Sequence, residues 1–319
     1  MQKYVTASST SRHARLKLLG YYAQRIVTSR TLRQAATRAV IAGLAATQGS
    51  TGRARRPAPA PIGAMPADGY LRLGRLLSER QCMDMRAWLR KRAMVAARGS
   101  GHAFTMDDIP AGTRFGDYPL DTVVNCPHVM ELANRPEILG MAAAYLGYTP
   151  RITLVGLRWS FPVDAAAGAD NVQQFHRDTE PGSIKLMVYL TDVDEGAGPH
   201  SYVAGTHRDR MPLRLRRYAD DEILRRHGAA TVITGPAGTG FAIDTKGIHR
   251  GIPPAARARL VLVIQYALLP FLLYEYAPAT YSGAARLDPY INCLVADAAG
   301  TGTGVQDPPP APAPQREAV

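Results

Sequence analysis

The sequence predicts a mainly β fold, an antiparallel sandwich or barrel preceded by two helices. Short apolar stretches separated by Gly- and Pro-rich turns recur between residues 151 and 268, which is typical of all-β architectures. Two stretches with apolar residues at helical spacing come before them. The chain has 319 residues, of which 46% are hydrophobic, so it is long enough to bury a substantial core.

The predicted helices have recognisable ends. Ser78 suits the N-cap of a helix over residues 79–97, because its hydroxyl can accept a hydrogen bond from the first turn. Pro136 fits the first turn of the second helix, and Gly147 fits its C-terminal stop. Residues 99–117 contain several glycines and a proline and are predicted to form a loop. The buried stripe of the first helix consists of Cys82, Met85 and Leu89.

The predicted strands follow from period-two alternation. Residues 151–161 alternate so that Arg158 and Ser160 share one face of the strand. A run of charged residues at 208–227 interrupts the strand pattern, and we expect a solvated surface there with a helix near residues 220–226. The other predicted strands are residues 173–177, 184–190, 231–234, 240–243 and 259–268.

Charge and proline content divide the chain into three parts. Residues 1–67 contain eleven Lys or Arg and no acidic residue, and we expect them to form a basic, flexible arm and linker. Residues 68–285 are expected to form one folded domain, and the Pro-rich residues 286–319 a disordered tail. The net charge of +12 belongs almost entirely to the arm, because the rest of the chain has 27 basic and 26 acidic residues. A nucleic-acid partner is therefore not expected.

Cysteine usage indicates a reducing compartment. Cys82, Cys126 and Cys293 are far apart and odd in number, which favours reduced thiols over a disulfide framework. No apolar run reaches the roughly 20 residues that a transmembrane helix needs. We therefore expect a cytoplasmic protein without a transmembrane segment. The sequence contains no pattern that indicates an oligomeric state.

The main chemical motif is His176-Arg177-Asp178. In a strand, residues two apart point to the same face, so the imidazole and the carboxylate would project side by side. A remote histidine would complete a 2-His-1-carboxylate triad, which holds non-heme Fe(II) on three sites and leaves the other positions open. We expect His249, 71 residues after Asp178, to be that histidine, and His207 is the alternative.

An arginine that could clamp a carboxylate lies ten residues after His249. Arg259 begins an apolar stretch that continues to Tyr266, and its planar guanidinium can form two parallel hydrogen bonds to a carboxylate. Arg257 has the same strand parity and is the alternative.

Taken together, these motifs resemble the phytanoyl-CoA dioxygenase-like family of Fe(II)/2-oxoglutarate oxygenases. The resemblance extends over residues 68–270 and implies a double-stranded β-helix, a jelly-roll or cupin-like core with the N-terminal helices packed outside it. The motifs that carry it are His176-Arg177-Asp178, Tyr189-Leu190-Thr191-Asp192-Val193, Gly196-Ala197-Gly198-Pro199, Gly205-Thr206-His207, His249-Arg250-Gly251 and Arg259.

The resemblance also implies a role for each site residue. His176, Asp178 and His249 would bind Fe(II), 2-oxoglutarate would take two further positions on the metal, and O₂ would take the last. Arg259 would bind the far carboxylate of 2-oxoglutarate, and Thr179 would form a hydrogen bond with the cosubstrate. The turn after His249 departs from the pattern of some relatives, which have small hydroxyl residues beside this histidine.

The expected function is that of an Fe(II)- and 2-oxoglutarate-dependent dioxygenase that hydroxylates a small organic substrate and releases succinate and CO₂. The alternative is a non-catalytic jelly-roll protein that keeps the metal site as a sensor or binding module. A nucleic-acid-modifying oxygenase would rest only on the basic arm. The complete set of His176, Asp178, His249 and Arg259 favours the enzyme.

Overall fold

The computed structural model of the chain describes most of the predicted domain and parts of both ends. Thr179 and the Pro-rich end after residue 297 lie outside the described residues. The described residues are 2–4, 26–54, 57–96, 103–162, 173–178, 180, 182–209, 216–269, 274–276 and 278–297.

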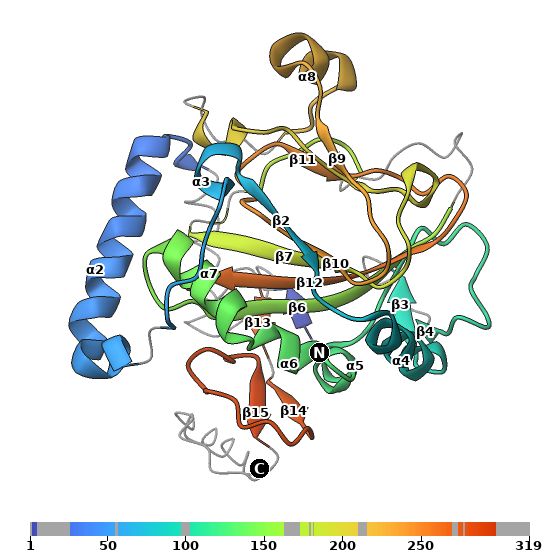
Figure 1. Ribbon diagram of the computed structural model, residues 1–319, viewed down its shortest axis with the longest axis horizontal. Coiled ribbons are helices and arrows are strands. Elements are labelled where there is room, and N and C mark those ends of the chain that lie inside the picture. The colour runs from blue at the N-terminus through green and yellow to red at the C-terminus, as the bar shows by residue number, and fades with distance from the viewer. Residues whose placement is uncertain are drawn as a thin grey trace, which may run out of the picture.

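The largest element is an eight-stranded antiparallel sheet, shown in the middle of Figure 1. Its strands follow the order β2-β10-β7-β12-β6-β5-β3-β4, so most neighbours in the sheet are distant in the sequence. The bounds are β2 Tyr70–Arg75, β3 Met94–Ala96, β4 Ala103–Phe104, β5 Phe115–Asp117, β6 Arg151–Ser160, β7 Ser183–Tyr189, β10 Thr239–Ile243 and β12 Arg259–Ala267.

A second, three-stranded sheet lies above the large one in Figure 1. Its order is β11-β8-β9. Tyr189, Phe241 and Val261 of the large sheet form a buried cluster with Tyr202 and Ile233 of the small sheet. Two antiparallel sheets packed on a shared apolar core are the mainly β jelly roll that the resemblance implies. The bounds are β8 His200–Tyr202, β9 Thr231–Ile233 and β11 His249–Gly251.

Helices cover the opposite face of the large sheet, as the resemblance implies. Leu186 and Val188 of β7 pack into the cluster that these helices share, whereas Met187 and Tyr189 point between the two sheets. Lys185 has the parity of the second pair, so it too belongs to the interior face of the jelly roll. Figure 1 shows the helices below the strands; they are α4 Glu79–Arg90, α5 Leu120–Asn125, α6 Val129–Ala133 and α7 Pro136–Leu146.

The predicted helix starts are correct, and one predicted end differs. Ser78 accepts a hydrogen bond from the backbone of Gln81 at 3.2 Å, and the Gln81 side chain accepts one from the Ser78 backbone at 2.9 Å. Helix α4 ends at Arg90, earlier than expected, because the chain turns to bury Met94 in β3. The predicted loop contains two short strands of the large sheet, β4 at its edge and β5 between β6 and β3.

Part of the predicted arm is a helix that packs on the domain. Helix α2, Arg30–Ala54, stands beside the jelly roll in Figure 1. Its residues Val40, Ile41 and Leu44 pack against the helix-covered core. The apolar residues of α2 stand among arginines and small residues, so the amphipathic pattern is weak in the sequence. Packing against the domain, rather than this pattern, stabilises the helix.

Residues beyond the predicted boundary at 285 are also folded. Leu287, Ile291 and Leu294 are buried in the same core. The backbone N–H of Ile152 donates to the carbonyl of Ile291 at 2.7 Å. The described domain therefore continues to residue 297, where β15 (Val295–Asp297) pairs with β14 (Ala279–Tyr281).

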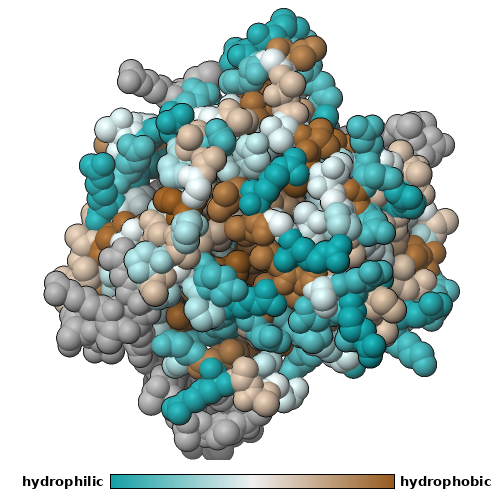
Figure 2. Space-filling view, in the orientation of Figure 1, coloured by the Kyte–Doolittle hydropathy of each residue, from teal (hydrophilic) through white to brown (hydrophobic). Residues whose placement is uncertain are grey.

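The run of charged residues at 208–227 contains the predicted helix. Helix α8, Asp220–His227, protrudes at the top of Figure 1, and Figure 2 shows this tip as mostly hydrophilic, as expected for a solvated face. Among the described helices, none combines the length and apolar character needed to cross a membrane. The remaining elements are α3 Met65–Asp68, β1 Gln2–Tyr4, β13 Tyr274–Tyr276, and the 3-10 turns Glu195–Ala197 and Thr206–Arg208.

Candidate active site

Two imidazoles and one carboxylate converge at the edge of the small sheet. One ligand atom from each of His176, Asp178 and His249 lies within 4.8 Å of the other two. Nε2 of His176 is 3.8 Å from Oδ1 of Asp178, and Nε2 of His249 is 4.0 Å from Oδ2. The three residues that sequence reasoning selected are therefore neighbours in space, and their free atoms face a common point.

Backbone pairing closes the 71-residue gap between these segments. His176 and His249 form an isolated antiparallel bridge in which each backbone N–H donates to the other's carbonyl at 3.0 Å. The N–H of Asp178 donates to the carbonyl of Thr245 at 2.8 Å. The predicted strand over residues 173–177 is thus reduced to bridges, but these bridges still direct His176 and Asp178 to one side.

The two imidazoles have the orientation that a metal requires. Nδ1 of His176 lies 2.8 Å from the carbonyl of Gln174, and Nδ1 of His249 lies 3.0 Å from the carbonyl of Gly247. A carbonyl can only accept, so both Nδ1 atoms carry the proton, and each Nε2 presents a lone pair toward Asp178. Burial lowers the pKa of both histidines, that of His249 to about 3, which keeps these rings neutral.

A lysine that sequence reasoning missed contacts the carboxylate. Nζ of Lys185, on the interior face of β7, lies 2.7 Å from Oδ2 of Asp178. Burial opposes ionisation of Asp178, but the charge and hydrogen bond of Lys185 together with the two nearby imidazoles outweigh it and hold the pKa of Asp178 well below its usual range. The available signal was strand parity, because Lys185 shares the interior face of β7 with apolar residues.

Arg177, between the two metal-site residues, ties the surrounding loops together. Its guanidinium is buried and donates to the hydroxyl of Tyr218 at 3.1 Å and to Oδ2 of Asp209 at 3.0 Å. It also donates to the carbonyls of Thr206 and Lys246, at 2.7 and 2.9 Å. These contacts fix the segment that carries His176 and Asp178 against the segment that leads to His249.

His207, the alternative third ligand, lies away from the cluster. Its Nε2 is 3.2 Å from the carbonyl of Pro66, before the first strand of the large sheet. A backbone carbonyl offers this nitrogen a hydrogen bond, and no ring atom of His207 belongs to the group of three ligand atoms.

The two candidate arginines have opposite environments. Arg259 is 5% exposed, and its Nη2 lies 3.3 Å from the hydroxyl of Ser160 on the neighbouring strand β6. Its Nε and Nη1 atoms are buried and have no hydrogen-bond partner among the described residues. Arg257 is exposed and pairs with Asp194 at the surface. A buried guanidinium with two unpaired nitrogens fits an anionic ligand, because such a charge is costly to bury alone.

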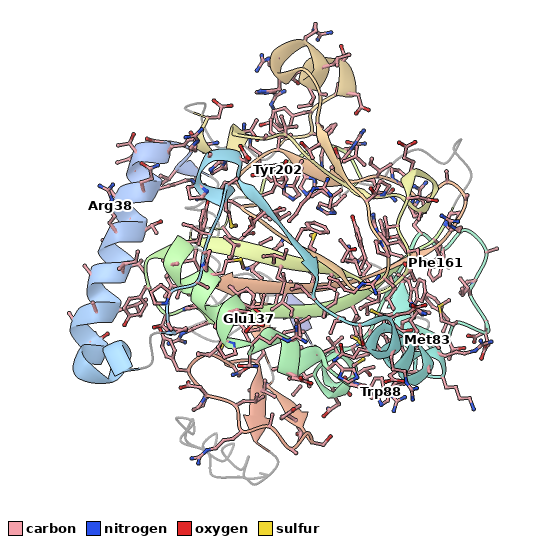
Figure 3. All side chains as sticks on the ribbon, in the orientation of Figure 1. Arg38, Met83, Trp88, Glu137, Phe161 and Tyr202 are labelled. Atoms are coloured by element: carbon pink, nitrogen blue, oxygen red, sulfur yellow. The ribbon has the colours of Figure 1, made fainter. Side chains whose placement is uncertain are left out.

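His200 is the second residue that sequence reasoning missed, and it lies between the metal site and Arg259. The ring of His200, on β8, stacks on His249 with centroids 6.0 Å apart. Its Nε2 is buried and has no partner in the described part of the chain. Tyr202, two residues further and labelled in Figure 3, lies on the same strand with its ring 6.5 Å from that of His249.

A basic cavity of about 290 Å³ adjoins the segment that carries Asp178. Helix α2 supplies Arg30 and Arg38 to its wall, and Lys246 and Glu180 also line it. The helix within the predicted arm therefore shapes a surface next to the candidate site.

The donor set fits the groups that the sequence implies. Two neutral imidazoles and an ionised carboxylate suit Fe(II) and leave part of its coordination sphere open, unlike a closed set of cysteines. The unpaired nitrogens of Arg259 fit the far carboxylate of a dicarboxylic acid. Thr179 lies outside the described residues, so its predicted hydrogen bond has no structural counterpart here.

Comparison with protein families agrees with this chemistry. The family profile described as phytanoyl-CoA dioxygenase (PhyH) matches residues 65–253, which is more than half of the chain. The matched range includes His176, Asp178 and His249 and ends before Arg259. No curated protein sequence matches the chain at a significant level.

Several solved structures resemble the fold at low identity. The non-heme alpha-ketoglutarate-dependent epimerase SnoN from nogalamycin biosynthesis is 19% identical over 65% of this chain and 81% of its own, with a TM-score of 0.49. HygX from Streptomyces hygroscopicus, with nickel and 2-oxoglutarate bound, is 16% identical over 70% and 93%, with a TM-score of 0.43. AviO1 from Streptomyces viridochromogenes Tue57 is 17% identical over 65% and 92%, with a TM-score of 0.43. Likenesses this distant carry no argument about the substrate of this chain.

Proposed function

Because the chain belongs to the phytanoyl-CoA dioxygenase family, and is therefore an oxygenase that depends on iron and 2-oxoglutarate, we propose that His176, Asp178 and His249 hold the iron. The convergence of three ligand atoms within 4.8 Å, from segments 71 residues apart, is the observation that carries this proposal. Both histidines would bind through Nε2, since each Nδ1 is committed to a carbonyl.

Arg259 binds the far carboxylate of 2-oxoglutarate in this proposal. The support is its burial at the start of β12 together with its two unpaired nitrogens. The charge of Arg257 is already compensated by Asp194 and by solvent at the surface, so Arg257 is not proposed to bind the cosubstrate. Thr179, next to Asp178 in the sequence, is proposed to form a hydrogen bond with the cosubstrate.

The chain's own residues position and shield the reactants. Iron together with 2-oxoglutarate and O₂ supplies the oxidising power, and succinate and CO₂ are released. Lys185 holds Asp178 through Oδ2, the oxygen that also faces His249, and Oδ1 faces His176. Arg177 fixes the surrounding loops, and Tyr189, Phe241 and Val261 exclude water from the space between the sheets.

We propose that the reaction is hydroxylation of a small organic molecule. The family acts on small-molecule substrates, and apolar side chains of the described residues fill the space between the two sheets. A nucleic-acid partner is not proposed, because the domain is close to neutral. A cytoplasmic location is proposed on the three free cysteines.

The functional unit is proposed to be the predicted domain 68–285, extended by residues 286–297, which bury Leu287, Ile291 and Leu294. Helix α2 is proposed as an outer layer of this unit that borders the basic cavity.

Succinate formation tests this function. Purified protein would be incubated with Fe(II), 2-oxoglutarate, O₂ and a panel of small organic substrates, and succinate would be measured. The expected result is succinate that requires both iron and 2-oxoglutarate and rises with one class of substrate. Tight iron binding without succinate under any condition would instead favour the metal-binding or sensor module.

A further inference from the structure

We propose that His200 is a second binding residue for the far carboxylate of 2-oxoglutarate, acting beside Arg259. This inference rests on the proposed function, since it concerns the same cosubstrate. It assigns a role to a residue that neither the sequence motifs nor the family match singled out.

Strand pairing places His200 next to the guanidinium. Gly251 of β11 and His200 of β8 are directly paired, so the side-chain directions of the two residues lie on the same face of the small sheet. A Cβ atom added at Gly251 would lie 3.1 Å from Nη2 of Arg259. The guanidinium thus occupies the space that a side chain at position 251 would fill, immediately beside His200.

The environment of His200 leaves a polar atom without a protein partner. The ring lies 5.6 Å from that of Phe241 and 6.0 Å from that of His249, which fixes its position between the core and the metal site. Its backbone N–H donates to the hydroxyl of Tyr189 at 2.8 Å. Its Nε2 is buried and has no partner among the described residues. Buried polar groups in folded proteins nearly always have a partner, so this atom indicates a missing ligand.

Three unpaired nitrogens therefore share one buried region: Nε and Nη1 of Arg259, and Nε2 of His200. Each carboxylate oxygen has more than one lone pair and can accept from several donors. An imidazole N–H and a guanidinium can consequently bind the same carboxylate. Because His200 also stacks on His249, it lies on the path between the metal and the guanidinium, as a cosubstrate that touches both would require.

Binding of two oxo acids by iron-loaded protein tests the proposal. 2-Oxoglutarate has the far carboxylate, whereas 2-oxobutyrate keeps the metal-binding end and lacks it. Dissociation constants would be measured anaerobically by calorimetry for the wild type, His200→Leu, His200→Asn and His200→Gln. His200→Leu should weaken 2-oxoglutarate binding about tenfold to a hundredfold, the range of one hydrogen bond to a charged group. Its binding of 2-oxobutyrate should change less than about threefold, well below the loss expected for a hydrogen bond.

The other variants separate binding from folding. His200→Asn keeps a polar side chain that is too short to reach the far carboxylate. It should show the same selective loss of 2-oxoglutarate affinity, and it provides the test if His200→Leu fails to fold. His200→Gln can place an N–H near the original Nε2 and should restore part of the affinity. Iron content should equal that of the wild type in every variant.

Two outcomes would overturn the proposal: unchanged 2-oxoglutarate affinity in His200→Leu and His200→Asn, or equal weakening of both oxo acids, which would place His200 at the metal end. Failure of the wild type to bind 2-oxoglutarate with iron present is a different result. It would reject the proposed function itself, and the two failures are therefore distinguishable.

Discussion

Nζ of Lys185 lies 2.7 Å from Oδ2 of Asp178, so the carboxylate assigned to the metal already has a cationic partner in the protein. Both side chains are largely buried, at 20% and 19% exposed, and solvent screens this pair only weakly. One carboxylate can serve two cations, because each of its oxygens accepts independently. Lysine therefore balances the charge of Asp178 without metal, and a bound metal adds a second compensating charge.

Lys185→Met should destabilise the metal-free protein more than the metal-loaded protein. Removing one partner of a buried pair costs about 3–5 kcal/mol, and partial exposure reduces this to about 2–3 kcal/mol here. With metal bound, Asp178 keeps a cation and most of that loss disappears. Thermal unfolding with and without Fe(II) under anaerobic conditions measures both states. By linkage, the variant should gain more stability from metal than the wild type does. An equal loss in both states would show that a bound metal does not replace the charge that Lys185 provides to Asp178.

Arg259→Ala should keep its iron and lose 2-oxoglutarate. Leaving a buried carboxylate without its partner typically costs ~3–5 kcal/mol, which raises the dissociation constant by roughly two to four powers of ten. Arg259→Lys should recover little, since an ammonium lacks the planar fork. Anaerobic titration with 2-oxoglutarate in the presence of Fe(II) measures the affinity.

Arg257→Ala is the matched control for this titration. Arg257 is exposed and paired with Asp194, so its loss should change the affinity by less than about threefold, as for other surface ion pairs. If Arg257→Ala loses 2-oxoglutarate and Arg259→Ala retains it, the assignment of the clamp is reversed.

Truncation after residue 285 should destabilise the protein, whereas truncation after residue 297 should not. The shorter chain lacks Leu287, Ile291 and Leu294, all buried in the helix-covered core. Deleting one buried leucine side chain costs about 2–5 kcal/mol, and three such losses approach the whole stability of a domain. Thermal unfolding and soluble yield of the two truncated chains provide the comparison. Equal melting temperatures of the two truncated chains would support the domain boundary at residue 285 that the composition predicts.

Local sequence patterns predict those elements whose stability is local. The hydroxyl of Ser78 caps α4 by accepting a hydrogen bond from the backbone of Gln81, and the Gln81 side chain accepts one from the Ser78 backbone. The two residues are only three positions apart, so the sequence alone indicates this cap. The alternation of β6 correctly places Arg158 and Ser160 on one face, and the pairing of Arg158 with Val261 shows that this is the interior face. Period-two arguments work here because the two faces of the strand meet different environments.

The features that sequence reasoning missed depend on pairing between distant segments. His200 acquires its position from the register of β8 with β11, which brings it opposite Gly251. Lys185 acquires its partner because the interior face of β7 brings its side chain to Asp178, whereas a lysine in a strand normally indicates a solvated position. The helix over 30–54 and the buried residues after 285 have weak patterns, and only contact with the core stabilises them. No local rule encodes such contacts.

Iron stoichiometry in three single-residue variants tests the central assignment most directly. Wild type, Asp178→Ala, His249→Ala and His207→Gln would be loaded with Fe(II) anaerobically, freed of excess metal and analysed for iron per chain. His207 is the control, because it is a buried histidine that contacts the carbonyl of Pro66 instead of the cluster. The expected result is about one iron per chain in the wild type and in His207→Gln, since one cluster provides three ligands. Asp178→Ala and His249→Ala should retain almost none while remaining folded. Full iron occupancy in either of these two variants would contradict the assignment of His176, Asp178 and His249 as the metal site.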